Sequence, residues 1–218
     1  MKIRVIDVTS LEPIMEACAK PYRSKPSEKL VKRVFEAGHR SVARHGMASF
    51  DVLGVSVNTL IQLSRHPFIN LTVESARFCD MSENEYVLPP FIKLEDEGEY
   101  IADQNLIMRI YEKWANKEGY TKKENREISK LFLPRAIKIN LTVSGNFQAW
   151  YEFLQLRNCV RAEWEIREMA GAISDILKFK VPAIFGNDFG CKGDEIGLCP
   201  ESESCGKYMT IKDFKKNL

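Results

Sequence analysis

The segment from Gln62 to Phe78, QLSRHPFINLTVESARF, carries side chains suited to binding an anion. Ser75 and Arg77 lie two positions apart near its end. We expect residues 71–78 to be extended, and side chains two positions apart on a strand point to the same face. A hydroxyl and a guanidinium on one face suit an oxyanion such as a phosphate, because both donate hydrogen bonds. The spacing therefore predicts a phosphate-binding pair.

Arg65 and His66 lie directly before Pro67, at the expected end of an amphipathic helix. Proline has no backbone N–H and cannot continue a helix, so the helix should end there. Two interpretations of the pair remain open. In the first, both side chains belong to the anion site. In the second, they only stabilise a helix C-terminus, where a cation is worth roughly 0.3 to 1 kcal/mol.

A second group of charged side chains occupies residues 157–167, RNCVRAEWEIR. Arg157 follows an apolar helix end, and Glu163 and Arg167 form an i, i+4 pair in the favourable orientation. On residue types alone, these charges are typical of a solvated helix face.

Three motifs together resemble the flavin-dependent thymidylate synthases, the ThyX family. The family signature is Arg-His-Arg, then seven residues later a serine followed by an arginine and an aromatic; here Pro67 replaces the third residue. An earlier His-x-Ser/Thr-x-x-Glu-His element is matched with Arg44 where glutamate is usual. A closing segment has the form Leu-Arg and then Ala-Gln-x-Glu-Ile-Arg. The matching positions are Arg65, His66, Ser75, Arg77 and Phe78; His39, Ser41 and His45; Leu133 and Pro134; and Leu156, Arg157, Ala162, Glu163, Glu165, Ile166 and Arg167.

The resemblance implies an α+β fold with a mixed or antiparallel sheet and packed helices. It also implies a homotetramer whose active sites are shared between subunits. The implied activity is reductive methylation of dUMP, or of a related pyrimidine nucleotide, with methylenetetrahydrofolate as carbon donor. Reduced FAD, replenished by NADPH, would supply the hydride, and no metal is implied.

The resemblance assigns roles to individual residues as well. Arg157 and Ser75 would take part in catalysis, Arg157 by stabilising negative charge on the pyrimidine carbonyls. The implied dUMP-binding residues are Gln62, Arg65, Ser75, Arg77, Lys130 and Arg157, and the implied flavin-binding residues are His39, Ser41, Arg65, His66 and Asn146.

Six positions depart from the family pattern where the flavin is expected: Arg44, Pro67, Asn70, Val73, Gln148 and Arg161. A lost charge-assisted contact costs roughly 1.5 to 3 kcal/mol. The alternative to an active enzyme is therefore a non-redox nucleotide-binding paralogue, acting as a partner subunit or a sensor, that has lost tight flavin binding.

The hydrophobic pattern places these residues on a mixture of helices and strands whose order does not alternate regularly. This order favours an α+β fold over a doubly wound parallel sheet. The expected strands are 1–8, 47–57, 71–78 and 136–143, and the expected helices are 11–19, 26–38, 55–64, 100–114, 121–133, 146–156 and 162–178.

Composition narrows the class of protein. The 32 basic and 30 acidic residues among 218 give a net charge of +2, which indicates neither a nucleic acid nor an anionic membrane as partner. The first residues, MKIRVIDVTS, lack the apolar segment of a signal peptide, and no apolar run is long enough to span a membrane. We therefore expect a cytoplasmic protein.

The chain divides into an expected catalytic domain, residues 1–186, and a tail, residues 187–218. Three cysteines, Cys191, Cys199 and Cys205, lie in this tail. Their gaps are longer than those of zinc-binding pairs, and no histidine is near. We prefer a reduced, glycine-rich surface tail to a zinc site.

Overall fold

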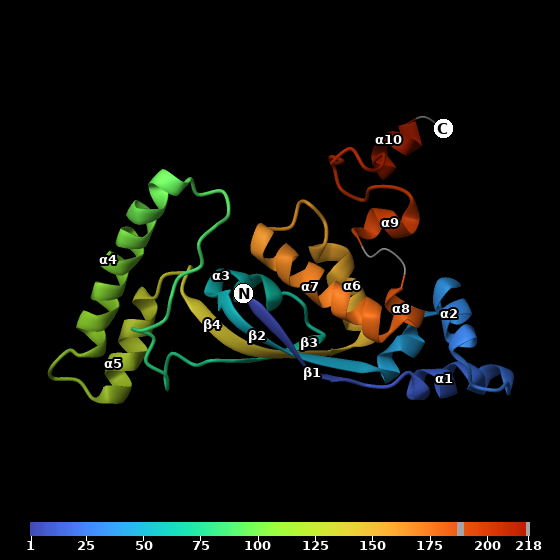
Figure 1. Ribbon diagram of the computed structural model, residues 1–218, viewed down its shortest axis with the longest axis horizontal. Coiled ribbons are helices and arrows are strands. Elements are labelled where there is room, and N and C mark those ends of the chain that lie inside the picture. Colours follow the sequence, from blue (N-terminus) through green and yellow to red (C-terminus); the bar gives the residue numbers. More distant parts are fainter. Residues whose placement is uncertain (187–189, 217–218) are drawn as a thin grey trace. The chain divides into compact units, whose positions relative to one another are not determined.

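A computed structural model of the chain describes residues 1–186 and 190–216 and has an α+β architecture (Figure 1). In these residues, four strands form one sheet in the order β1-β2-β4-β3. The strands are β1 (Lys2–Val8), β2 (Met47–Ser56), β3 (Ile69–Val73) and β4 (Lys138–Asn146).

Neighbouring strands run antiparallel. The N–H of Thr9, just after β1, donates to the carbonyl of Met47 at the start of β2, whereas Arg4 inside β1 pairs with Asp51 further along β2. Strand β4 alternates between fully buried and partly exposed residues, as the sequence KINLTV predicts. The expectation of an α+β fold with an antiparallel sheet is confirmed.

The chain forms two compact units. Unit 1 comprises Met1–Arg4, Asp51–Arg65 and Leu71–Val143. Unit 2 comprises Val5–Phe50, His66–Asn70 and the described part of Ser144–Leu218.

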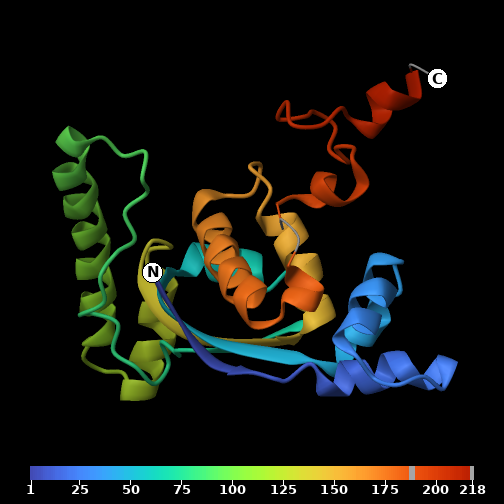
Figure 2. The same cartoon turned by 45° about the vertical axis from the view of Figure 1, so that its right-hand side comes forward.

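The helices of unit 1 include the long helix α4 and the shorter α5, which lie side by side in Figures 1 and 2. Helix α5 begins at a capping box, because the Thr121 side chain accepts from the Glu124 N–H and the Glu124 carboxylate accepts from the Thr121 N–H. The sequence predicted this cap. The elements are α3 (Val57–Leu63), η3 (Leu94–Asp96), α4 (Glu97–Ala115), α5 (Lys122–Ser129) and η4 (Lys130–Phe132).

Unit 2 has an aromatic core beneath α6. Trp150 is fully buried, packs edge-on against Phe50 and Phe153, and donates from its indole N–H to the carbonyl of Ala48 at 3.1 Å. The elements are α1 (Glu12–Ala19), η1 (Lys20–Tyr22), α2 (Glu28–Glu36), η2 (Arg40–His45), α6 (Phe147–Arg157), α7 (Trp164–Lys180), α8 (Pro182–Phe185), α9 (Lys192–Ile196) and α10 (Ile211–Lys216).

One predicted strand is wrong in its second half. Strand β3 ends at Val73, and Ser75 to Cys79 form a turn in which the Ser75 carbonyl accepts from the N–H groups of Phe78 and Cys79, each at 2.9 Å. Serine offers the backbone such local hydrogen bonds in competition with a strand ladder. The idea that Ser75 and Arg77 share one face of a strand is therefore incorrect.

The predicted tail is more ordered than its composition suggested. It contains α9 and α10, and Cys199 is buried. The six cysteines are all free thiols. The proposed boundary between residues 186 and 187 opens a segment, 187–189, that lies outside the described residues, so the division into domain and tail stays a prediction.

In the part of the chain that the structure covers, none of the helices has the length and apolar character needed to cross a membrane. Over the same residues, His, Cys, Asp and Glu side chains form no group of three or more that could hold a metal ion.

Candidate functional site

His39 is fixed by the way α2 ends. The N–H of Gly38 donates to the carbonyl of Phe35 and the N–H of His39 donates to that of Val34, which is the hydrogen-bond pattern of a Schellman cap. Gly38 has φ +88°, a left-handed conformation that suits glycine. His39 therefore leaves α2 in a defined position, exposed, with Ser41 exposed two residues on in η2.

His66 and Arg157 are brought together within unit 2. Arg157, the last residue of α6, donates from Nε to Nε2 of His66 at 2.9 Å. The His66 ring also packs edge-on against Phe153, one turn earlier on α6, with 4.9 Å between ring centroids. Two of the motifs that carry the family resemblance therefore meet at one hydrogen bond.

The hydrogen bond requires a neutral imidazole, and the surroundings of His66 enforce that state. Burial, and then the positive charge of Arg157, lower the pKa of His66 to about 4. Burial also lowers the pKa of Arg157, although a guanidinium stays protonated at physiological pH. With so low a pKa, His66 adds no positive charge at the helix end, which favours the interpretation that places it in the site.

Asn146 starts α6. Its side-chain oxygen accepts from the N–H of Ala149 at 2.9 Å, which makes it the N-cap of the helix. Because this oxygen is already bonded, the amide N–H donors are the part of Asn146 suited to a ligand. The helix that it starts carries Phe153 and Arg157, so the residue also serves the site indirectly.

Ser75 and Arg77 lie together in the turn that follows β3. The Ser75 hydroxyl accepts from the Arg77 N–H at 3.4 Å, and the hydroxyl keeps its own O–H donor. From α5, Arg126 donates to the carbonyl oxygens of Arg77 and Phe78 and so holds this turn. The two residues are near each other as predicted, but through a turn and not a strand face.

Arg77 has a carboxylate partner that sequence reasoning missed. Its guanidinium donates to Glu127 on α5 at 2.9 Å, and both side chains are partly exposed. Lys130 follows Glu127 by three positions, at the end of α5, which places both on one side of the helix. The sequence contained a signal for this contact. Glu127 lies three positions before Lys130, a predicted phosphate-binding residue, and so faces the same side of the chain.

Gln62 and Arg65 lie at the C-terminal end of α3. The helix ends at Leu63, and the N–H of Arg65 donates to the carbonyl of Gln62 at 3.2 Å. Arg65 is exposed. The expected helix stop before Pro67 is confirmed.

The candidate residues therefore form groups within each unit. Unit 1 holds the turn with Ser75 and Arg77, the end of α3, and Lys130, which directly follows the helix that contacts the turn. Unit 2 joins His66 to Arg157 and holds the other flavin candidates. The two groups are Gln62, Arg65, Ser75, Arg77 and Lys130 in unit 1, and His39, Ser41, His66, Asn146 and Arg157 in unit 2.

Positions that depart from the family pattern have partners in this chain. Gln148 donates to Glu152 at 2.7 Å, one turn along α6. Arg161 lies 3.7 Å from the carboxylate of Glu201 and donates to the carbonyl of Glu203. Gln148 and Arg161 thus each have polar partners within unit 2.

Comparison with known proteins gives concordant results. A family model described as thymidylate synthase complementing protein (Thy1) matches residues 4–183. A flavin-dependent thymidylate synthase from Nitratidesulfovibrio vulgaris is 30% identical over 185 residues, which are 82% of this chain and 75% of that protein. One from Pyrococcus furiosus is 29% identical over 205 residues, 87% of this chain and 79% of that protein.

Solved structures of similar fold come from Helicobacter pylori. One thymidylate synthase X (ThyX), described as being with FAD and dUMP, matches with a TM-score of 0.70 and 23% identity over 85% of this chain and 97% of its own. A second, described as complexed with FAD and dUMP, has a TM-score of 0.71 and 24% identity over 87% of this chain and 100% of its own. At these identities the likeness is one of fold.

Proposed function

The chain belongs to the flavin-dependent thymidylate synthase family, and from that premise we propose that it is an enzyme that reductively methylates dUMP or a related pyrimidine nucleotide. Residues 1–186 would form the catalytic domain and residues 187–218 a tail. The extent of the family match, residues 4–183, supports this division.

The hydrogen bond between Arg157 and His66 carries the proposal. It joins two motifs that are 91 positions apart in the chain and leaves a guanidinium beside a neutral, half-buried imidazole. A positive charge held in such a place stabilises negative charge that develops on a pyrimidine carbonyl. Arg157 would supply that charge, and His66 would orient its guanidinium.

The remaining nucleotide contacts would come from unit 1. Arg77, Lys130 and the Ser75 hydroxyl are donors suited to the phosphate of dUMP, with Gln62 and Arg65 at the end of α3 completing the set. Arg77 already donates to a carboxylate, that of Glu127, so its guanidinium can reach an anion. We assign a catalytic role to Ser75 beside Arg157.

The flavin candidates fit the cofactor in part. An exposed imidazole at His39, a hydroxyl at Ser41 and a guanidinium at Arg65 are donors that flavin carbonyls and dinucleotide phosphates accept. Asn146 can add its amide donors, and His66 can add ring contact. Bound FAD would supply the hydride of the methylation, with NADPH as reductant and methylenetetrahydrofolate as carbon donor.

We place this activity in the cytoplasm and in a homotetramer with shared active sites. Light scattering of the purified protein at micromolar concentration would measure the mass of the assembly, and a monomer that retains full activity would contradict shared sites.

Purified protein gives a direct test of the activity. A flavin absorption band, binding of dUMP by calorimetry, and NADPH oxidation that depends on dUMP and methylenetetrahydrofolate are the expected results. Mass spectrometry should detect the methylated nucleotide. Flavin-loaded protein that binds dUMP and forms no methylated product under reducing conditions would contradict the proposal.

The second candidate is a non-redox paralogue that binds the nucleotide. It is favoured by the internal partners of Gln148 and Arg161, because side chains paired with Glu152 and Glu201 have fewer donors left for a flavin. A colourless protein that binds dUMP, and does not take up added FAD, would select this candidate.

A further inference from the structure

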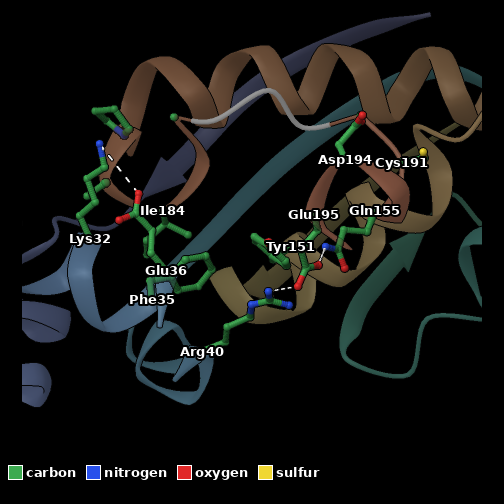
Figure 3. A pocket seen from close by; sticks show the side chains of 14 residues that line it. Lys32, Phe35, Glu36, Arg40, Tyr151, Gln155, Ile184, Cys191, Asp194 and Glu195 are labelled. Atoms are coloured by element: carbon green, nitrogen blue, oxygen red, sulfur yellow. Dashed lines mark hydrogen bonds and ion pairs between the residues drawn. The ribbon is translucent and has the colours of Figure 1, made fainter. Parts of the chain in front are cut away.

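Glu195, in the short tail helix α9, accepts hydrogen bonds from two side chains of unit 2. One donor is the guanidinium of Arg40, at the start of η2, and the other is the amide of Gln155 in α6 (Figure 3). The Arg40 and Glu195 side chains are 28% and 24% exposed, so their ion pair is less screened by water than a surface pair. The three residues line a cavity of about 240 Å³.

Arg40 is held from a second side by an aromatic ring. Its guanidinium carbon lies 4.6 Å from the centroid of the Tyr151 ring, and Tyr151 is buried. An arginine over an aromatic face, with a carboxylate at its end, has little freedom to change rotamer. Figure 3 shows Arg40, Tyr151, Gln155 and Glu195 converging at one side of the cavity.

The two donors belong to the segments that carry the candidate site residues of unit 2. Arg40 stands between His39 and Ser41, and Gln155 precedes Arg157 by two positions on α6. The Schellman cap fixes where the chain leaves α2, and the side chain of Arg40 is the next anchor along the chain. One carboxylate therefore ties both segments to the tail.

Glu195 is itself carried on a folded part of the tail. The neighbouring Asp194 accepts from the Tyr208 hydroxyl at 2.9 Å and pairs with Lys207. Further on, the N–H of Cys199 donates to the carbonyl of Met209, and the N–H of Ile211 donates to the carbonyl of Cys199. These contacts join α9 and the residues after it to the segment 207–211, so α9 is held by the rest of the tail.

We propose that the C-terminal tail contributes to the site through Glu195. Glu195 is a positioning residue that holds η2 through Arg40 and α6 through Gln155, and we call these three residues the clamp. The family match covers residues 4–183, so Arg40 and Gln155 lie within it and Glu195 lies beyond it. The effect on flavin rests on the proposed function; the effect on the position of η2 does not. Loss of the clamp should loosen the segment that carries His39 and Ser41.

The test uses the full-length protein with Glu195→Gln, which keeps the shape of the side chain and removes its charge. Hydrogen exchange of the ligand-free protein should rise at residues 38–45. FAD titration should show roughly a three- to tenfold weaker affinity, the range that a half-buried ion pair supplies. The matched control is Glu203→Gln, which removes an exposed carboxylate from the same tail and should change neither reading.

The outcomes separate the clamp from the proposed function. Unchanged exchange at residues 38–45 in Glu195→Gln would overturn the clamp. Faster exchange with unchanged FAD affinity would overturn the positioning role. If the unaltered protein takes up no FAD, the proposed flavin chemistry fails, while the exchange comparison in ligand-free protein still decides whether Glu195 holds η2.

Discussion

Arg157 donates from Nε to Nε2 of His66 at 2.9 Å, and the same imidazole packs against Phe153 one turn earlier on α6. The acceptor nitrogen must carry no proton, so the bond and the low pKa of His66 support each other. Within this pair the guanidinium therefore carries the positive charge and the imidazole carries none. Two consequences can be measured, one for ligand binding and one for stability.

Replacing Arg157 by alanine should weaken dUMP binding roughly 10- to 100-fold, because hydrogen bonds to a charged group are worth about 1.5 to 3 kcal/mol. The affinity of Arg157→Lys for dUMP should lie between those of wild type and Arg157→Ala, since lysine keeps the charge and lacks the planar fork and the Nε donor. Isothermal calorimetry measures both. Arg109→Ala, which removes an exposed arginine from α4, should leave the affinity unchanged. An equal affinity for wild type and Arg157→Ala would remove Arg157 from the site.

The stability of the folded chain should depend on the protonation of His66. Its pKa is about 4 in the fold against an ordinary value of 6.5, so the unfolded chain binds the proton more tightly. The free energy of unfolding should therefore fall as the pH drops from about 6.5 toward 4, and this contribution should not vary above pH 6.5. Urea unfolding measured across this range in wild type and His66→Gln gives the comparison.

The substituted protein should lose that part of the pH dependence, because glutamine does not titrate. Acidic groups with lowered pKa values, such as Asp51 and Glu124, are common to both proteins and cancel in the difference. His45→Gln, at an exposed histidine, is the control and should keep the wild-type slope. Identical slopes for wild type and His66→Gln would mean that His66 has the same pKa in the folded and the unfolded chain, and would contradict the lowered value.

Local sequence signals predicted the helix and strand starts that depend on neighbouring residues. The Thr121–Glu124 capping box and the Asn146 N-cap each act within three positions of the chain, and both helices begin where expected. The wrong prediction for the segment 71–78 also has a local cause. The Ser75 hydroxyl accepts from the N–H of Arg77, two residues on, and a pattern of alternating residues does not show that competition with the strand.

The spacing of residues in the sequence could not predict contacts between distant segments. Arg77 and Glu127 are 50 positions apart, and His66 and Arg157 are 91 apart. Family resemblance placed Arg77, His66 and Arg157 among the candidates, but it did not indicate that Glu127 would pair with Arg77 or that His66 would be neutral. Both properties depend on burial and on partners that only the folded chain brings near.

Gly38→Ala should destabilise the protein by about 1 to 2 kcal/mol. Gly38 has φ +88° at the end of α2, and a Cβ disfavours this conformation. Gly171→Ala is a matched control in α7 of the same unit, where a Cβ would meet nothing within 4 Å. Alanine is the better helix former there, so it should stabilise by about 0.5 to 1 kcal/mol. Urea unfolding would reveal the opposite signs, and a stabilising Gly38→Ala would contradict the Schellman cap.

Glu127 should compete with the nucleotide phosphate for Arg77. The two side chains are paired at 2.9 Å and partly exposed, so a pair of this kind contributes up to about 1 kcal/mol. Glu127→Gln should therefore tighten dUMP binding by up to about fivefold and leave binding of deoxyuridine, which has no phosphate, unchanged. Added salt should reduce the difference, because it screens both ion pairs. Glu85→Gln breaks a different surface pair, with Lys138, and should alter neither ligand. Weaker dUMP binding by Glu127→Gln would show instead that Glu127 orients Arg77 for the phosphate.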